Sequence, residues 1–249
     1  MFHLAAFTEL LGTVANTDIN ALADQIIPIQ NDHFLPPRDY NVVAAYVASA
    51  TLSRARLNSP KIRQTNPLYV RPINVGTLPA TDANILMLFD NPYLLRGEEE
   101  IALEATSAIA MGTERFTGLI WLMDRHDPAP SGDVHNVRIT STTAAVANVW
   151  SDLTATFESQ LPAGRYAIVG CEHQSTNGLA IRIIVDDQYL RPGWLSITAL
   201  ANRLPYEFYR RLFGTWGHFR TTSLPRFQVL ANAADAVHEV YLSVVRVGP

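Results

Sequence analysis

The sequence predicts an all-β protein, a jelly-roll sandwich or barrel with N-terminal helices and one short late helix. From residue 84 onward, apolar and β-branched segments of strand length alternate with turns rich in Asn, Asp, Gly, Pro and Ser. Roughly seven to nine strands at such spacing are typical of sandwiches and jelly rolls. The segments include NILMLFD, RFTGLIWLMD, NVRITSTTAAVANVW, GRYAIVGCEH, GLAIRIIVD, WLSITAL and HEVYLSVVRV.

The N-terminal part shows a different pattern. Over residues 2–27, apolar side chains recur at steps of three and four, which is typical of amphipathic helices, and Pro28 ends the pattern. We therefore predict an N-terminal helical arm over residues 1–37 and a single β-barrel domain over residues 38–249.

The first part of that domain contains less regular elements. The run 41–57 fits either a strand or a helix, and its β-branched residues favour a strand. Ser59 followed by Pro60 predicts the start of a short helical turn. We expect residues 58–82, which are rich in proline, to include an extended segment that lies on a neighbouring surface. The run 205–214, from Pro to Gly, predicts the late helix.

Several strands are apolar on both faces. Every residue from Leu119 to Met123 is apolar, and so are both alternating sets within RYAIVGC, residues 165–171. A strand with one solvent-exposed face would instead show alternating apolar and polar side chains. The cover is predicted to come either from the N-terminal helices and the extended segment or from neighbouring copies of the chain.

Composition excludes several classes of function. Charged residues make up 17% and the formal net charge is -4, so nothing points to binding of nucleic acid through a basic arm. With Cys171 as the only cysteine, no intramolecular disulfide forms, and folding does not require an oxidising compartment. We see no signal peptide or membrane-spanning segment, and expect folding in the cytoplasm.

Cys171 and His173 form the first candidate for chemistry. Two residues apart on a strand, they share a face, so a Cys/His nucleophile pair is conceivable. The alternative is a packed hydrophobe near the tip of a β-hairpin, with strands 165–173 and 179–186 joined by a turn at Asn177 and Gly178, and with His173 where the strand meets solvent. No surrounding signature supports the nucleophile, so the hairpin is favoured.

Other polar clusters fit loops better than sites. Metal-ligand residue types occur at Asp124, His126, Asp127, Asp133 and His135, and an Asp-Pro-rich strand connection has the same composition.

The acid run 96–100, RGEEE, resembles a solvated turn more than paired catalytic carboxylates, and Asp186 with Asp187 resembles a strand end more than a calcium site. Phosphate-binding glycine loops, GxSxG and HExxH are absent. The sequence therefore predicts no enzyme, no cofactor and no metal.

A family resemblance rests on two groups of segments. They are ATLSRARLNSPKIRQ with NPLYVRPIN, and LPAGRYAIVG with GLAIRIIV and LRPG. Over residues 38–194, the sequence resembles β-barrel major capsid proteins of tailless icosahedral bacterial viruses. In that family a jelly-roll unit forms capsomers, and extended arms tie neighbours together. The chain lacks a basic arm, so direct genome condensation is not expected.

The resemblance implies a viral structural protein, a self-assembling subunit of an icosahedral capsid that is assembled in the host cytoplasm and resides in the virion. Its implied partners are other copies of itself and other capsid proteins, and binding of a specific nucleic-acid sequence is not implied. The resemblance does not specify whether the virion has an internal membrane. The interface is predicted to include residues from the extended segment and the late helix: Tyr69, Val70, Arg71, Ile73, Tyr206, Arg210 and Arg211.

Two rival functions remain. A carbohydrate- or surface-binding jelly-roll module, such as a fibre or adhesin domain, would need an exposed aromatic platform, for which Trp194 and Trp216 are the candidates. An enzyme would need the convergence of Asp124, His126 and His135, or of Cys171 and His173.

Overall fold

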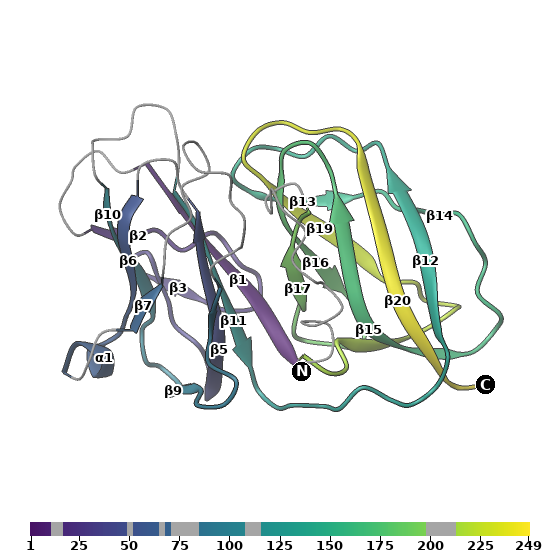
Figure 1. Cartoon of the computed structure of the whole chain (residues 1–249), viewed down its shortest axis with the longest axis horizontal. Helices are drawn as coiled ribbons and strands as arrows, with labels where there is room; N and C mark the ends of the chain where they lie inside the picture. Colours follow the sequence, from purple (N-terminus) through teal and green to yellow (C-terminus); the bar gives the residue numbers. More distant parts are fainter. Residues whose placement is uncertain (11–16, 49–51, 65–67, 71–84, 108–115, 198–212) are drawn as a thin grey trace. The chain divides into compact units, whose positions relative to one another are not determined.

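Strands follow one another almost without interruption in the computed structural model (Figure 1). The structure describes residues 1–10, 17–48, 52–64, 68–70, 85–107, 116–197 and 213–249. The N-terminal helices predicted over residues 2–27 are wrong, because Phe2–Glu9 forms strand β1 and Thr17–Ile19 forms β2. All side chains from Phe2 to Thr8 are buried, so the apolar residues at three- and four-residue steps belong to a strand that is covered on both faces.

The chain divides into two compact units. Unit 1 comprises Met1–Leu4 and Arg125–Pro249, and unit 2 comprises Ala5–Asp124. Strand β1 therefore begins in unit 1 and continues in unit 2. No helix in the described part of the chain is long and apolar enough to cross a membrane.

Unit 1 has two sheets within the described residues, and Figure 1 shows them as two layers. Neighbouring strands within each sheet are antiparallel. The first sheet has the order β14 (Thr156–Phe157), β12 (Val134–Ser141), β20 (His238–Gly248), β15 (Arg165–Gln174) and β18 (Gly217–Arg220). The second has the order β13 (Trp150–Leu153), β19 (Arg226–Ala231), β16 (Gly178–Ile184) and β17 (Gly193–Leu195).

Unit 2 also has two larger sheets within the described residues. One has the order β1, β11 (Phe116–Met123), β5 (Tyr40–Ala48) and β8 (Leu86–Met87), with β9 (Tyr93–Leu95) also paired to β5. The other has the order β2, β10 (Ala102–Ser107), β6 (Leu52–Asn58) and β7 (Leu68–Val70). A small hairpin joins β3 (Ile29–Gln30) to β4 (His33–Phe34).

Both units have the same strand order. Eight main strands of each unit are numbered here along the chain: β1, β2, β5, β6, β7, β8, β10 and β11 in unit 2, and β12, β13, β15, β16, β17, β18, β19 and β20 in unit 1. In the first sheet of each unit, the order is strand 1, strand 8, strand 3 and strand 6. In the second sheet, the order is strand 2, strand 7, strand 4 and strand 5. This interleaving of two antiparallel sheets is the jelly roll, so the predicted fold class is confirmed and the fold occurs twice.

The predicted single β-barrel domain over residues 38–249 is replaced by these two units, whose boundary falls between Asp124 and Arg125. The boundary lies in the Asp- and Pro-rich connection between β11 and β12, and the same composition is found in ordinary strand connections, so it did not reveal a boundary. The arm predicted over residues 1–37 is likewise part of the sheets, through β1 to β4.

The prediction that strands are covered on both faces is confirmed for β11, whose residues are all buried. This burial is present in a single chain, so the cover comes from the protein itself and not from a second copy. The run 41–57 is confirmed as strand, in β5 and β6.

A short helix begins where the sequence predicted one. Helix α1 spans Pro60–Gln64, and the Ser59 Oγ accepts a hydrogen bond from the Ile62 N–H at 3.2 Å, as expected of an N-cap. Of the segment predicted as extended, 58–82, residues 68–70 form an edge strand and residues 71–82 lie outside the described residues. The predicted late helix, 205–214, lies mostly outside them as well.

Candidate functional site

Cys171 lies in the core of unit 1. Its side chain is fully buried, and burial raises the pKa of its thiol well above the usual range. His173 contacts Ser196 and His238 instead of forming a pair with the thiol. A thiolate nucleophile needs a lowered pKa and access to substrate, and Cys171 has neither.

The hairpin predicted around Cys171 is wrong, although its strands are present. Strand β15 pairs with β20 and β18, whereas β16 pairs with β19 and β17, so the two strands belong to opposite sheets of unit 1. The connection between them crosses from one sheet to the other. Apolar residues on both faces reveal a buried strand but not its partner, and a crossing connection uses the same turn residues as a hairpin.

His173 belongs to a buried hydrogen-bonded chain and does not meet solvent as predicted. Its Nδ1 lies 2.7 Å from the Ser196 Oγ, and its Nε2 lies 3.2 Å from the Nδ1 of His238. All three side chains are buried. Burial, followed by the charge of His238, lowers the pKa of His173 to about 3, so its imidazole is neutral at pH 7.

Gly178 makes room for this chain, because a Cβ there would lie 2.3 Å from the Ser175 Oγ and 2.8 Å from the His173 Cε1. The group is closed to any substrate, and we interpret it as a structural element that links the two sheets of unit 1.

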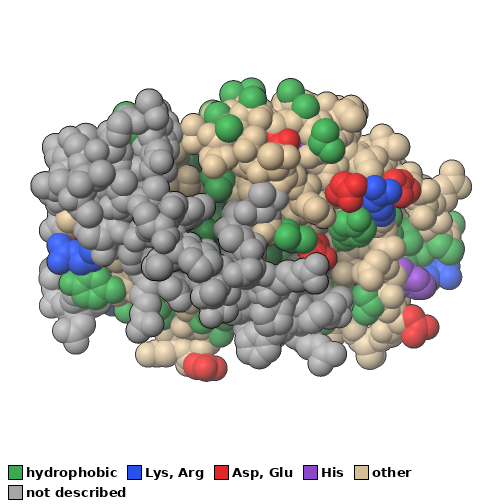
Figure 2. Space-filling view, turned by 45° about the horizontal axis from the view of Figure 1, so that its top comes forward, with side chains coloured by type: hydrophobic (Ala, Val, Ile, Leu, Met, Phe, Trp, Pro, Cys, Tyr) green, Lys and Arg blue, Asp and Glu red, His purple; other side chains and the backbone are tan. Residues whose placement is uncertain are grey.

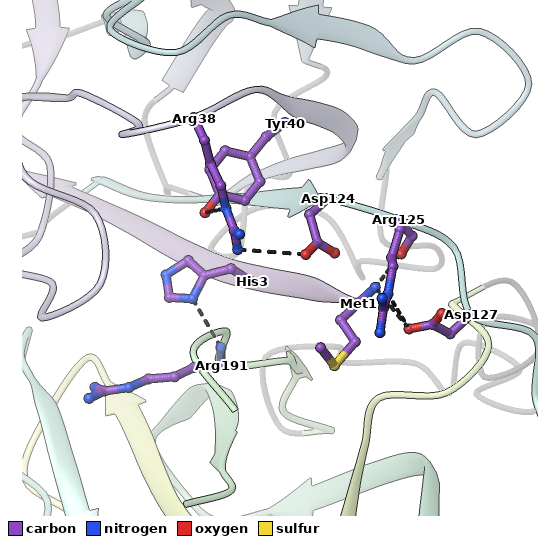
Figure 3. Close-up of polar contacts among 8 residues, drawn as sticks. All are labelled: Met1, His3, Arg38, Tyr40, Asp124, Arg125, Asp127 and Arg191. Carbon is purple, nitrogen blue, oxygen red and sulfur yellow. Dashed lines mark hydrogen bonds and ion pairs between the residues drawn. The ribbon is translucent and has the colours of Figure 1, made fainter. Parts of the chain in front are cut away.

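The Asp and His residues of the 124–135 connection do not form a metal site. Within the described residues, no group of three or more His, Cys, Asp or Glu side chains could hold an ion. In unit 2, Asp124 lies 3.6 Å from the guanidinium of Arg38, which also donates to the Tyr40 hydroxyl (Figure 3).

In unit 1, Arg125 Nε donates to Asp127 at 3.0 Å, and the Met1 amino group lies near the same carboxylate (Figure 3). His135 is exposed on β12. The enzyme that would use Asp124, His126 and His135 therefore has no support in this loop.

The acid run 96–100 is a turn, as the sequence predicted. Arg96 pairs with Asp39 at 2.7 Å, and Glu99 accepts hydrogen bonds from the Tyr93 hydroxyl and from the Arg96 N–H. Asp186 likewise accepts from Ser223 and Arg226, which holds the pKa of its carboxyl below the usual range. Each of these two clusters is a surface turn that holds one ion pair between an arginine and an aspartate.

The aromatic platform required by a carbohydrate-binding module is absent at the predicted positions. Trp194 is 2% exposed and Trp216 is 1% exposed. Both pack in unit 1 against Phe213, and Trp216 also contacts Phe2 edge-on at 5.1 Å between ring centroids. These tryptophans form the core of the unit and offer no ring to a ligand.

Of the predicted interface residues, two are described. Tyr69 is 47% exposed on the edge strand β7, whereas Val70 is buried in unit 2. The other five lie outside the described residues: Arg71, Ile73, Tyr206, Arg210 and Arg211.

One polar feature was not predicted from the sequence. In unit 1 a concavity is lined by arginines from strands that pair far apart along the chain, Arg165 of β15 and Arg220 of β18, together with His218. The sequence shows arginine at both positions, but only the register of β15 with β18 brings them together.

Cys171 provides a direct test of the closed core. We expect the native protein to resist alkylation by iodoacetamide at pH 8 for hours and to react fully once unfolded in urea, because the buried thiol stays protonated. Mass spectrometry of the intact chain measures this. Rapid modification of the folded protein would show instead that the thiol is accessible.

Comparisons with known proteins add little to this description. No family model matches the sequence, and no curated protein matches it. Among solved structures, the major capsid protein P2 of bacteriophage PM2 is similar at 10% identity and a TM-score of 0.25, and the STIV major capsid protein at 10% identity and a TM-score of 0.26. Each alignment covers 99% of this chain and 97% of the other. The likeness is weak, and the jelly-roll assignment rests on the strand order.

Proposed function

We propose that this chain is a viral structural protein, a self-assembling subunit of an icosahedral capsid. The observation that carries the proposal is the repeated jelly roll, since two units of the same strand order stand in one chain. Jelly rolls occur in viral capsid and lectin domains. The family resemblance of residues 38–194 points to the capsid among these.

The repeated jelly roll suits a closed, symmetric oligomer that serves as the building block of a shell. Homo-oligomers favour closed rotational symmetry. Three copies around a threefold axis would bring together six units of one fold, the number of folds that a sixfold position in a shell requires. A trimer of this single chain would then occupy a sixfold position in the shell, so a separate six-subunit assembly would not be needed there.

Exposed valines give the subunit a surface for contact. Val146 is 61% exposed, Val149 is 42% exposed and Val237 is 66% exposed. They lie on the connections β12–β13 and β19–β20, which are held together where the Ala145 N–H donates to the Asp235 carbonyl oxygen at 2.6 Å. Figure 2 shows hydrophobic side chains along the upper edge of the described surface, with few charges among them. We assign this valine patch to contacts between copies.

The assembly state tests the proposal. Purified protein is expected to form trimers of about 83 kDa, three times the 27.6 kDa chain, or larger shells in light scattering and negative-stain microscopy. Substituting both Val146→Glu and Val237→Glu should shift the population toward monomer, because two charges would be buried at the contact.

The control is the double substitution Val134→Glu and Val247→Glu, which adds the same two charges at valines that are 42% and 39% exposed, near the other end of β20. It should assemble as the unsubstituted protein does. A monodisperse monomer at high concentration of the unsubstituted protein would overturn the capsid proposal. Equal assembly of all variants would overturn only the valine patch.

A further inference from the structure

Unit 1 contains a polar concavity of about 600 Å³ whose walls are formed before any ligand arrives. One wall is the segment that begins at Arg125, and it is fixed to the residue after Gly214. The Thr215 N–H donates to the Asp127 carbonyl oxygen at 2.7 Å, and the Thr215 hydroxyl donates to the Pro128 carbonyl oxygen at 2.9 Å. A volume of this size suits a small molecule.

Two arginines on neighbouring strands face this concavity. Arg165 on β15 lies directly opposite Arg220 on β18 in the antiparallel register. Within the described residues, neither guanidinium forms an ion pair or a side-chain hydrogen bond. Like charges directly opposite one another destabilise a sheet, so their pairing has no benefit for the fold. Two exposed guanidinium groups on adjacent strands, with no ion-pair partner among the described residues, suit the oxygens of a carboxylate or phosphate.

Acidic side chains limit the charge of the ligand. Asp187 and Asp127 also line the concavity, and Asp127 already pairs with Arg125 at 3.0 Å. His218 adds no charge at pH 7, because burial and then the nearby Arg165 keep its pKa below the usual range. The two carboxylates would repel a polyanion. A ligand with one anionic group and several hydroxyls could place the anion near the arginines and donate hydroxyl hydrogens to the carboxylates.

We propose that this concavity binds a small hydroxylated organic anion, which presents carboxylate or phosphate oxygens to Arg165 and Arg220 and donates hydroxyl hydrogens to the carboxylates of Asp127 and Asp187. The assignment does not depend on the capsid function, since the residues that line the concavity all come from one unit of a single chain and need no assembly.

Titration calorimetry with four probes tests the site. Glucuronate and glucose 6-phosphate carry both an anion and hydroxyls, inorganic phosphate carries only the anion, and glucose carries only hydroxyls. We expect the two hydroxylated anions to bind at least tenfold more tightly than phosphate or glucose. The tighter of the two identifies whether the natural anion is a carboxylate or a phosphate. Equal affinity for all four would overturn the proposal.

Substitutions assign the two contacts separately. Arg165→Gln and Arg220→Gln should each weaken the hydroxylated anions at least tenfold, whereas the charge-matched control Arg54→Gln, in unit 2, should leave affinity unchanged. Asp187→Asn should weaken the hydroxylated anions relative to inorganic phosphate several-fold, because it replaces an acceptor of the ligand hydroxyls. Equal losses in Arg54→Gln and the pocket variants would show only a response to net charge, and would overturn the site.

The free protein gives an independent readout. Arg165→Glu replaces two opposed like charges with an opposite pair, so this variant should melt at a higher temperature than the unsubstituted protein and bind no anion. Bound anion should also raise the pKa of His218, measured by NMR titration of its ring protons. A lower melting temperature for Arg165→Glu, or no change at His218, would contradict the geometry.

Discussion

Acidification from pH 7 to pH 4 is expected to lower the free energy of unfolding of unit 1 by roughly 3 kcal/mol through His173 alone. In the folded protein, burial and the neighbouring His238 lower the pKa of His173 to about 3, while the ordinary value of the unfolded chain is 6.5. Between these values the unfolded chain binds a proton that the folded chain does not. Stability is therefore retained above pH 6.5 and lost progressively as the pH falls toward 3.

Urea unfolding followed by tryptophan fluorescence between pH 7 and pH 4 measures this slope. His173→Gln retains a hydrogen-bonding side chain but does not titrate, so its stability should change less with pH, whatever its absolute stability. The control is His135→Gln, because His135 is exposed on β12. If His173→Gln and the unsubstituted protein give parallel curves, the imidazole is not the source of acid sensitivity.

Replacing Gln228 with leucine is expected to lower the free energy of unfolding by roughly 3 kcal/mol. The Gln228 Oε1 accepts hydrogen bonds from Arg182 at 2.7 Å and from Arg191 at 2.9 Å, and all three side chains are buried. Its Nε2 donates to Asp152 at 2.7 Å. Leucine fills a similar volume, but it removes the acceptor shared by two buried guanidinium groups.

Chemical denaturation again measures the effect, with Gln174→Leu on the exposed end of β15 as the control for the loss of an amide. Gln228→Glu keeps an acceptor for the two guanidiniums but sets a second carboxylate against Asp152, so it should be combined with Asp152→Asn, which supplies a donor. This double variant should be destabilised less than the leucine variant. A leucine variant as stable as the unsubstituted protein would show that Arg182 and Arg191 do not need this glutamine.

Local features of the fold could be predicted from the sequence where they depend on neighbouring residues. Ser59 and Pro60 specify the start of α1, and the β-branched residues of 41–57 favour strands over a helix. The N-terminal run 2–9 was misassigned because a strand covered on both faces need not alternate, so its apolar residues can also satisfy a helical spacing. The two units could not be separated, since their equivalent strands share an order of pairing and not a sequence period.

The candidate sites show the same limit. The charged turn at 96–100 was predicted because its partners lie nearby in the sequence or are ordinary surface charges. His173 was placed at the surface because its partners, Ser196 and His238, come from strand ends 23 and 65 residues away. Arg165 and Arg220 meet only through the register of two strands. Residue types are visible in a sequence, but their juxtaposition requires the pairing of strands.

The division of β1 has a consequence for the order in which the protein can be completed. Phe2 contacts Phe213 at 4.5 Å between ring centroids, the Leu4 N–H donates to the Arg191 carbonyl oxygen, and the His3 Nδ1 accepts from the Arg191 N–H (Figure 3). Residues 1–4 are synthesised long before their partners Arg191 and Phe213. Unit 1 therefore closes only after the whole of unit 2 has been synthesised, and a fragment that begins at Arg125 would have an unfilled hydrophobic hole where Phe2 and Leu4 belong.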